Sequence, residues 1–201
     1  FYFLTWLYSI YLGVSAFKFL LPNSTHYSLI LSGIIVLSAI LCLRDVLRKF
    51  HNSKGKAGKI KILMALFLLF TSLLSCTYLV LNAPRLEIEQ PFLNQTDVII
   101  GLILLGSVLA LNWVFWGGIL TTVIGIAFLY FVFGHLFTDP ILKHQHFDLS
   151  FIISYMGMNT TEGLFAYLPD GVEKMYFLVL FSAVLIGGGM IGLVVELGKL
   201  M

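Results

Sequence analysis

Long apolar runs separated by short polar stretches dominate the pattern along this chain of 201 residues. A membrane-spanning helix needs about 20 consecutive apolar residues, whereas the strands of a membrane barrel alternate in polarity over about 10 residues. The runs here are long and show no such alternation, so the pattern predicts an all-α, polytopic transmembrane helical bundle. The six spans that we expect are residues 1–21, 27–43, 62–81, 98–112, 116–133 and 175–195.

The fourth and fifth expected spans come from one run, residues 98–133, that contains no charged residue. A single helix of this length would extend about 54 Å, far beyond a hydrocarbon core of about 30 Å. Gly117 and Gly118 permit a reversal of the chain, and Trp113 and Trp116 are typical of the membrane interface. The run therefore predicts a helical hairpin that turns near residues 112–118.

Composition agrees with a membrane protein, because 59% of the residues are hydrophobic and 11% are charged, whereas soluble domains carry about a quarter charged residues. Cys42 and Cys76 fall inside expected spans, where a thiol behaves as a small apolar group, so they indicate no disulfide. Lys18 lies near the end of the first span, and we expect its ammonium group to reach the interface. It is the only charged side chain within the expected spans, which indicates that the spans hold no transport pathway.

Charge is distributed unevenly between the polar stretches. Residues 44–61 carry seven of the twelve Lys and Arg residues, whereas residues 82–97 carry three acids against one arginine. The positive-inside rule predicts that residues 44–61 form a cytoplasmic loop and that residues 134–174 lie outside. The basic stretch lacks interleaved aromatic residues, so we expect it to contact lipid headgroups and not nucleic acid.

Residues 134–174 mix histidines, charged residues and prolines into apolar sequence, so they do not form a simple span. The apolar residues within 147–156 predict a short interfacial helix, with Asp148 or Ser150 as its N-cap, on the membrane or against the spans. His and Asp side chains of this region could bind a metal, but their spacing matches no helix motif such as H-E-x-x-H. We therefore assign no catalytic, cofactor or metal residue, although the candidates would be His135, Asp139, His144, His146 and Asp148.

Four segments in the second half of the chain carry a family resemblance. They are residues 130–135 (Tyr-Phe-Val-Phe-Gly-His), 146–150 (His-Phe-Asp-Leu-Ser), 161–165 (Thr-Glu-Gly-Leu-Phe) and 177–181 (Phe-Leu-Val-Leu-Phe). In order and spacing they resemble the fused membrane permeases of tripartite ATP-independent periplasmic (TRAP) transporters, of the type that works with TAXI-class receptors. The resemblance covers about residues 128–190 and is strongest at residues 161–165.

The resemblance implies a small-subunit-like membrane scaffold of five spans in residues 1–140, an external junction in residues 141–174 and the first helix of the transport domain in residues 175–201. It also implies a permease in the bacterial inner membrane, not an enzyme, that takes up organic acids delivered by a periplasmic solute-binding receptor. A sodium gradient would drive uptake, with sodium bound outside this segment and no other cofactor. The implied partners are membrane lipid, the receptor and the remainder of the large transport subunit, so we expect the native chain to continue beyond Met201.

The same resemblance implies a junction motif with a role in receptor docking or in an interface. A capping or interface role for Glu162 is favoured over proton chemistry. Gly188 and Gly192 have the spacing that lets transmembrane helices pack closely, and they could equally supply a hinge. Two other functions stay open: a membrane-embedded, metal-dependent hydrolase that uses the external His and Asp residues, and a non-catalytic membrane assembly protein. The junction motif consists of His135, Asp148, Thr161, Glu162, Gly163 and Phe165.

Overall fold

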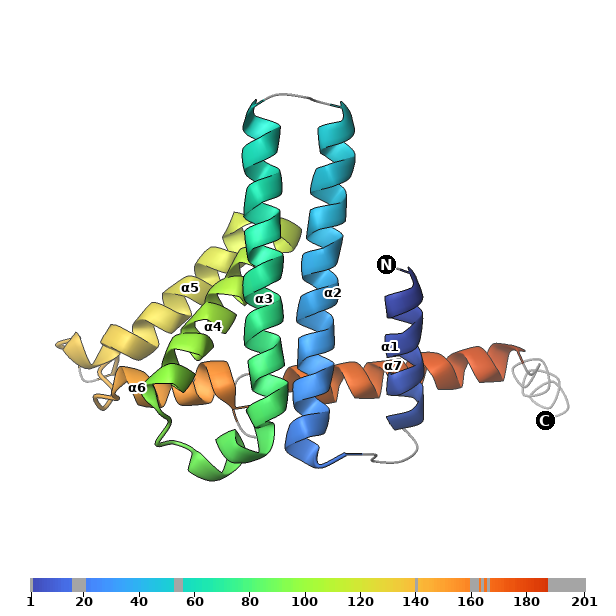
Figure 1. Ribbon diagram of the computed structural model, residues 1–201. Helices are drawn as coiled ribbons and strands as arrows, with labels where there is room; N and C mark the ends of the chain where they lie inside the picture. The colour runs from blue at the N-terminus through green and yellow to red at the C-terminus, as the bar shows by residue number, and fades with distance from the viewer. Residues whose placement is uncertain are drawn as a thin grey trace, which may run out of the picture.

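The computed structural model describes residues 2–15, 21–52, 56–139, 141–159, 163, 165 and 167–187. Every regular element in these ranges is helical, which confirms the all-α prediction. The elements are α1 (Tyr2–Ser15), α2 (Asn23–Asn52), α3 (Lys56–Glu89), α4 (Gln95–Trp116), α5 (Gly118–Phe133), the 3-10 turn η1 (Gly134–Leu136), α6 (Leu149–Ile153), the π-helical turn η2 (Ser154–Met158) and α7 (Tyr167–Gly187) (Figure 1).

Four helices among the described residues are long and apolar enough to cross a membrane, and they correspond to the second to fifth expected spans. The chain is therefore a polytopic membrane protein. The described part of α1 has 14 residues, fewer than a span needs, and the end of the first expected span, including Lys18, lies outside the described residues. The four spanning segments are Asn23–Lys49, Gly58–Glu89, Gln95–Trp116 and Gly118–Leu136.

The sixth expected span coincides only in part with α7. This helix begins at Tyr167 and not at residue 175, and its first two turns contain Asp170, Glu173 and Lys174. The end of the sixth expected span, with Gly188 and Gly192, lies outside the described residues. The count of six spans therefore stays a prediction.

Helices α2 and α3 form a long antiparallel hairpin (Figure 1). With 30 and 34 residues they extend about 45 and 51 Å, well beyond a hydrocarbon core of about 30 Å. The expected loop at residues 44–61 is wrong, because both helices continue through the basic residues: Lys and Arg are good helix formers, and charge does not end a helix once it reaches water. We call this end of the hairpin the basic tip, defined by Arg44, Arg48, Lys49, Lys59 and Lys61.

The expected loop at residues 82–97 is also mostly helical. Helix α3 continues to Glu89 and α4 begins at Gln95, so that residues 90–94 alone connect them, with a cis peptide bond between Gln90 and Pro91. Asp97 lies in the first turn of α4, where a negative charge is favourable beside the helix dipole. The acids that were assigned to a loop are thus held by helices.

The hairpin predicted within residues 98–133 is confirmed. Helix α4 ends at Trp116 and α5 begins at Gly118. The intervening Gly117 has a φ of 82°, a backbone conformation that residues other than glycine rarely adopt. The Gly117 N–H group donates to the Trp113 carbonyl at 3.1 Å and closes the end of α4. None of the α5 residues is buried, so its apolar surface is left for lipid or another helix.

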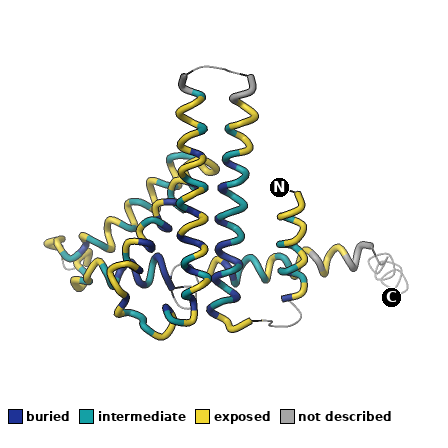
Figure 2. Tube along the Cα trace, viewed as in Figure 1, coloured by how far each residue is buried: buried dark blue, intermediate teal, exposed yellow. Residues whose placement is uncertain are grey.

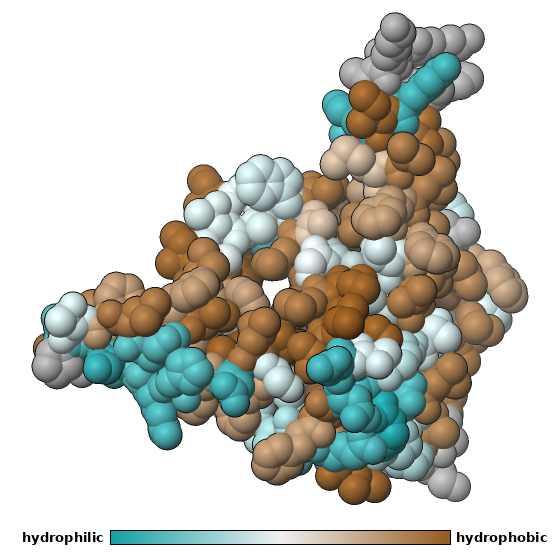
Figure 3. Space-filling view, turned by 60° about the vertical axis from the view of Figure 1, so that its left-hand side comes forward, coloured by the Kyte–Doolittle hydropathy of each residue, from teal (hydrophilic) through white to brown (hydrophobic). Residues whose placement is uncertain are grey.

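Burial is concentrated at the end of the bundle opposite the basic tip (Figure 2). There α2, α3 and α4 meet α6 and η2 around a core that includes Leu31, Leu79, Leu104, Ile153 and Met158. Helix α7 packs on α1 and α2 and lies across their direction (Figure 1). The surface in Figure 3 is apolar in a broad belt, with hydrophilic residues gathered above and below it.

Candidate functional site

The polar side chains that could carry chemistry form three clusters in the described part of the chain. All three lie at the end of the bundle opposite the basic tip, which we call the polar end. The first joins α3 to α4, the second joins α7 to α1 and α2, and the third joins the end of α5 to the segment that follows it. The clusters are centred on Arg85 and Asp97, on His26 and Glu173, and on His144.

The first cluster is an ion pair around a buried carboxylate. Asp97 is 0% exposed, and its Oδ1 and Oδ2 lie 2.7 and 3.2 Å from the Arg85 guanidinium nitrogens. The Tyr78 hydroxyl donates to Oδ1 at 2.5 Å, and the Asn94 backbone N–H donates to Oδ2 at 3.1 Å. Arg85 also reaches Glu89 at 2.5 Å, one helical turn further along α3. Both ions are therefore satisfied by the protein, and the cluster locks the two helices together.

This cluster corrects the expectation that the spans contain no charged side chain except Lys18. Arg85 and Asp97 both lie within helices that are long enough to cross a membrane. They sit in the last turns of α3 and the first turn of α4, at the edge of the apolar belt and not at its middle. A sequence signal existed, because Tyr78 and Arg85 lie seven residues apart and so share a face of α3.

The second cluster ties α7 to the first two helices. His26 is 1% exposed; its Nε2 lies 3.4 Å from the Glu173 carboxylate and its Nδ1 lies 2.8 Å from the Tyr11 hydroxyl. One turn along α7, the Tyr176 hydroxyl donates to the Ser9 carbonyl at 2.7 Å. Residue 26 lies between the first and second expected spans, and no pattern in the sequence pointed to its pairing with a residue 147 positions away.

The third cluster closes the loop that follows α5. The two ring nitrogens of His144 face backbone carbonyls, that of Gln145 at 2.6 Å and that of Tyr130 at 3.0 Å. These two hydrogen bonds, the one to Tyr130 first, raise the pKa of His144 above its ordinary value, because both nitrogens must carry a proton to donate. The Tyr130 hydroxyl donates to the Leu142 carbonyl at 2.8 Å. Gly134 is required here, since a Cβ at this position would overlap the His144 ring.

His135, a member of the junction motif, belongs to this third cluster. Its half-buried ring stands edge-on to the ring of His146, with 4.4 Å between centroids, and lies 6.5 Å from the ring of His144. The described residues contain no group of three or more His, Cys, Asp or Glu placed to hold a metal ion. Both nitrogens of His144 face backbone carbonyls and not a space shared with other candidate ligands, so the geometry of the described residues gives the hydrolase hypothesis no support.

The short helix predicted within residues 147–156 is confirmed as α6, with Asp148 in an extended conformation as its N-cap. The Asp148 carbonyl accepts the Ile152 N–H at 3.0 Å, and its side chain is exposed. Of the two placements expected for this helix, packing against the spans is observed, because α6 and η2 lie on α4. Asp148 is thereby held at the surface of the polar end.

Two other members of the junction motif have structural roles. Gly163 is buried, and a Cβ there would overlap the Tyr155 carbonyl and the side chain of Asn159. Phe165 is 4% exposed and belongs to the main core. Thr161 and Glu162 lie outside the described residues. At these two positions the motif packs against η2, against the residue that follows it and against the main core.

Helix α4 and η2 approach each other closely at two glycines, Gly101 and Gly157, which no pattern in the sequence had indicated. A Cβ on Gly157 would lie 3.0 Å from the Gly101 carbonyl oxygen, and a Cβ on Gly101 would lie 2.7 Å from the Ile153 side chain. Small residues allow such an approach between membrane helices. The Asn159 side-chain amide also donates to Gln90, which links the end of η2 to the turn after α3.

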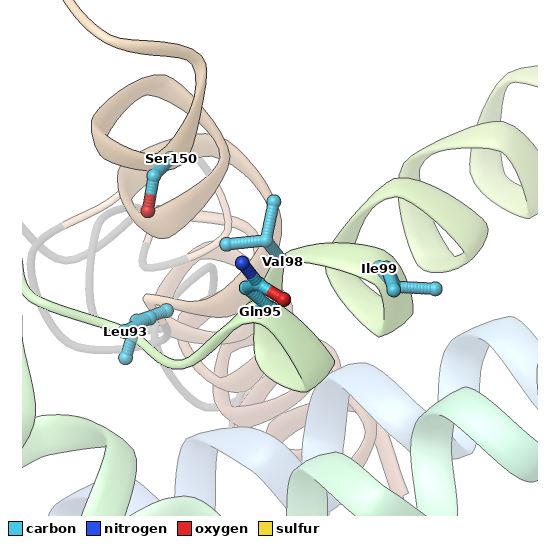
Figure 4. A pocket seen from close by; sticks show the side chains of 5 residues that line it. All are labelled: Leu93, Gln95, Val98, Ile99 and Ser150. Carbon is cyan, nitrogen blue, oxygen red and sulfur yellow. The ribbon is translucent and has the colours of Figure 1, made fainter.

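A hollow of about 300 Å³ lies at the surface of the polar end, between the start of α4 and α6 (Figure 4). Its lining combines apolar Leu93 and Val98 with the amide of Gln95 and the hydroxyl of Ser150. In Figure 4 the Ser150 hydroxyl points from α6 toward the start of α4, whereas Ile99 points away. A hollow of this size is at the lower end of the range for small-molecule sites, and its mixed lining suits one protruding side chain of a docking protein.

Two of the three clusters join elements that follow each other in the chain, whereas the cluster of His26 and Glu173 joins residues 147 positions apart. The hollow lies at the same end of the bundle. The described part of the polar end is therefore held together by these polar contacts, with the hollow on its surface. Comparison with protein-family models, with curated proteins and with solved structures found no match to this chain.

Proposed function

We propose that this chain is the scaffold part of the membrane permease of a secondary transporter, of the TRAP type, in a bacterial inner membrane. The observation that supports this best is the position of the charged side chains in the four described spans. All of them lie near helix ends, and the stretches between hold none. A coupled transporter needs a polar site near the middle of the bilayer, usually built from broken helices. A bundle without such a site supports a bracing role for this portion.

The orientation that we propose places the basic tip in the cytoplasm and the polar end outside. The tip is defined by five Lys and Arg residues, whereas α3 ends with Glu87 and Glu89. The positive-inside rule assigns the basic side to the cytoplasm. The turn of the α4–α5 hairpin, with Trp113 and Trp116, lies toward the same side as the tip, as an alternation of spans requires (Figure 1).

The polar end is then the surface on which a periplasmic receptor would dock. Asp148 is exposed there, and the hollow between Leu93, Gln95 and Ser150 offers a place for a receptor side chain. The family resemblance supplies the rest of the proposal, namely organic acids as the substrate and sodium as the coupling ion. Both would bind in the remainder of the large transport subunit.

Helix α7 would join the scaffold to that subunit. Its first half is tied to α2 through Glu173 and to α1 through Tyr176, while its apolar residues Leu178, Val179 and Phe181 are exposed. Because the first half of α7 is anchored to the scaffold and the second half exposes apolar side chains, the second half can pack against another membrane domain.

Transport by the full-length protein in liposomes tests the proposal. With receptor, a mixture of small organic acids and an inward sodium gradient, we expect accumulation that disappears when the receptor or the gradient is omitted. Residues 1–201 alone should accumulate nothing. Accumulation by this segment alone would show that the scaffold assignment is wrong, and full-length protein that assembles with partners but never transports would favour the assembly-protein hypothesis.

A charge reversal tests the docking surface. Charges at the rim of an interface mainly change the association rate and its salt dependence. Asp148→Lys should therefore weaken receptor-dependent uptake at low salt, while Asp45→Lys, an exposed acid near the basic tip, should leave it unchanged. Equal uptake by the two variants would mean that docking does not involve Asp148.

A further inference from the structure

A large apolar groove opens between α2, α3 and α4, on the side of the basic tip. Its volume is about 1110 Å³. Helices α3 and α4 are in contact along part of their length, and the groove lies beside this contact; the apolar surface in Figure 3 is hollowed. The proposed function does not use this groove.

The walls of the groove are apolar almost throughout. Val46, Phe67, Leu68 and Ile103 lie along it, and a Cβ added to Gly106 would meet no atom within 4 Å. The two hydroxyls of the wall are already engaged, because Ser107 Oγ donates to Thr71 Oγ1 at 3.1 Å and Thr71 Oγ1 donates to the Leu68 carbonyl at 3.0 Å. The interior therefore offers a ligand space and dispersion contacts but few hydrogen bonds.

Positive charge and an interfacial aromatic residue stand at the open end. Lys61 itself lines the groove, and its side chain is exposed. Lys49 lies three residues beyond Val46, and hence on the same face of α2 as the groove. Trp113 contributes to the wall at this end of α4. Tryptophan and lysine at the end of an apolar groove are the combination expected where lipid headgroups lie.

We propose that this groove is a binding site for an anionic phospholipid, with acyl chain between α3 and α4 and phosphate against Lys61 and the basic tip. A phospholipid matches both parts of the site, because its chain needs only apolar walls and its headgroup needs cations. A transmembrane helix seated in the groove would bury the ammonium of Lys61, and none of the residues that line the groove is an acid to pair with it. The proposal requires membrane insertion but not the transporter assignment.

Quenching of Trp113 fluorescence by brominated phospholipids tests the site in the purified chain of 201 residues, which contains three tryptophans. Trp6→Phe and Trp116→Phe leave Trp113 as the reporter. Brominated phosphatidylglycerol should displace phosphatidylcholine of the same chain length with a clear preference. Lys61→Gln should reduce that preference about fivefold, which corresponds to roughly 1 kcal/mol per basic residue near a membrane surface. Lys143→Gln, an exposed lysine at the polar end, should not change it.

A second pair of variants separates the groove from lipid that merely surrounds the protein. Gly106→Phe should fill the groove and abolish the preference for phosphatidylglycerol. Gly125→Phe on α5, where a Cβ also meets no atom within 4 Å, should retain it. Equal quenching by the two lipids in the unsubstituted protein, or a preference that survives both Lys61→Gln and Gly106→Phe, would overturn the proposal. Protection of Trp113 from both lipids would also overturn it, because a helix or a second copy would then cover the groove.

Discussion

Replacement of Arg85 by alanine isolates the buried carboxylate of Asp97 from its counter-charge. In the intact protein this carboxylate is 0% exposed and accepts hydrogen bonds from Arg85, from Tyr78 and from the Asn94 N–H. After Arg85→Ala, the phenol and the amide still hold the carboxylate, but they carry no positive charge. The ion stays desolvated without the interaction that offsets this cost.

The expected loss of stability follows from how deeply each partner is buried. Leaving one ion of a buried pair uncompensated costs about 3–5 kcal/mol, which we expect for Arg85→Ala. The reverse change, Asp97→Ala, leaves a guanidinium that is 33% exposed and still paired with Glu89, so about 1.5–3 kcal/mol is expected from the lost hydrogen bonds. Glu89→Gln removes an exposed pair between neighbouring turns and should cost about 0.3–0.5 kcal/mol.

Reversible unfolding in mild detergent, followed by circular dichroism as denaturant is added, would measure these differences. The double variant Arg85→Ala with Asp97→Ala should lose less than the sum of the single variants, by about 0.5–3 kcal/mol, because the two residues are in contact. An apolar pair, Arg85→Met with Asp97→Leu, should recover much of the stability that Arg85→Ala loses. If Arg85→Ala costs no more than Glu89→Gln, the buried-charge reasoning is refuted.

Three further predictions concern other parts of the fold. The pKa of His144 is raised by the two carbonyls that it meets, so its hydrogen bonds stabilise the loop below pH about 6.5 and are lost as the pH rises through the raised value. Amide protection factors around it, in which the intrinsic pH dependence of exchange is divided out, should be larger at pH 5.5 than at pH 8.5, and a glutamine variant should lose this difference. Gly157→Ala should cost about 1–3 kcal/mol by forcing η2 away from α4, whereas Gly125→Ala should be neutral or slightly stabilising, as thermal unfolding would show. In intact cells an impermeant thiol reagent should label Gln145→Cys and not Lys49→Cys, and the reverse pattern would contradict the proposed orientation.

Elements set by local chemistry could be predicted from the sequence. The uncharged run was too long for one helix, and the chain reverses at Gly117, the position that needs a positive φ. Asp148 ends an extended segment and occupies the N-cap position of a short apolar helix, as its residue type indicates, although its backbone carbonyl and not its side chain accepts the hydrogen bond from the helix. In both cases a few neighbouring residues contain the whole physical cause.

The clusters of the polar end could not be predicted in this way, because each depends on how separate elements pack against one another in space. Each expected span ended where charged residues began, so Arg85 and Asp97 were assigned to a loop. In the structure the helices continue past the apolar belt, and two ions of opposite charge meet across a short turn. The contact of Gly101 with Gly157 is similarly a property of two surfaces and is not visible in either segment alone.

Because the α2–α3 hairpin is long, a small tilt at one of its ends produces a large displacement of the other end. The two helices support each other along their length, and they are clamped where the bundle is most buried, while the far end stands free of α4 and α5 (Figures 1 and 2). For a rod about 51 Å long, a tilt of about 10° at the clamped end displaces the far end by roughly 9 Å. A small rearrangement among α3, α4 and α6 would thus be amplified into a large displacement of Arg48 and Lys59 on the other side of the membrane, where a probe could detect it.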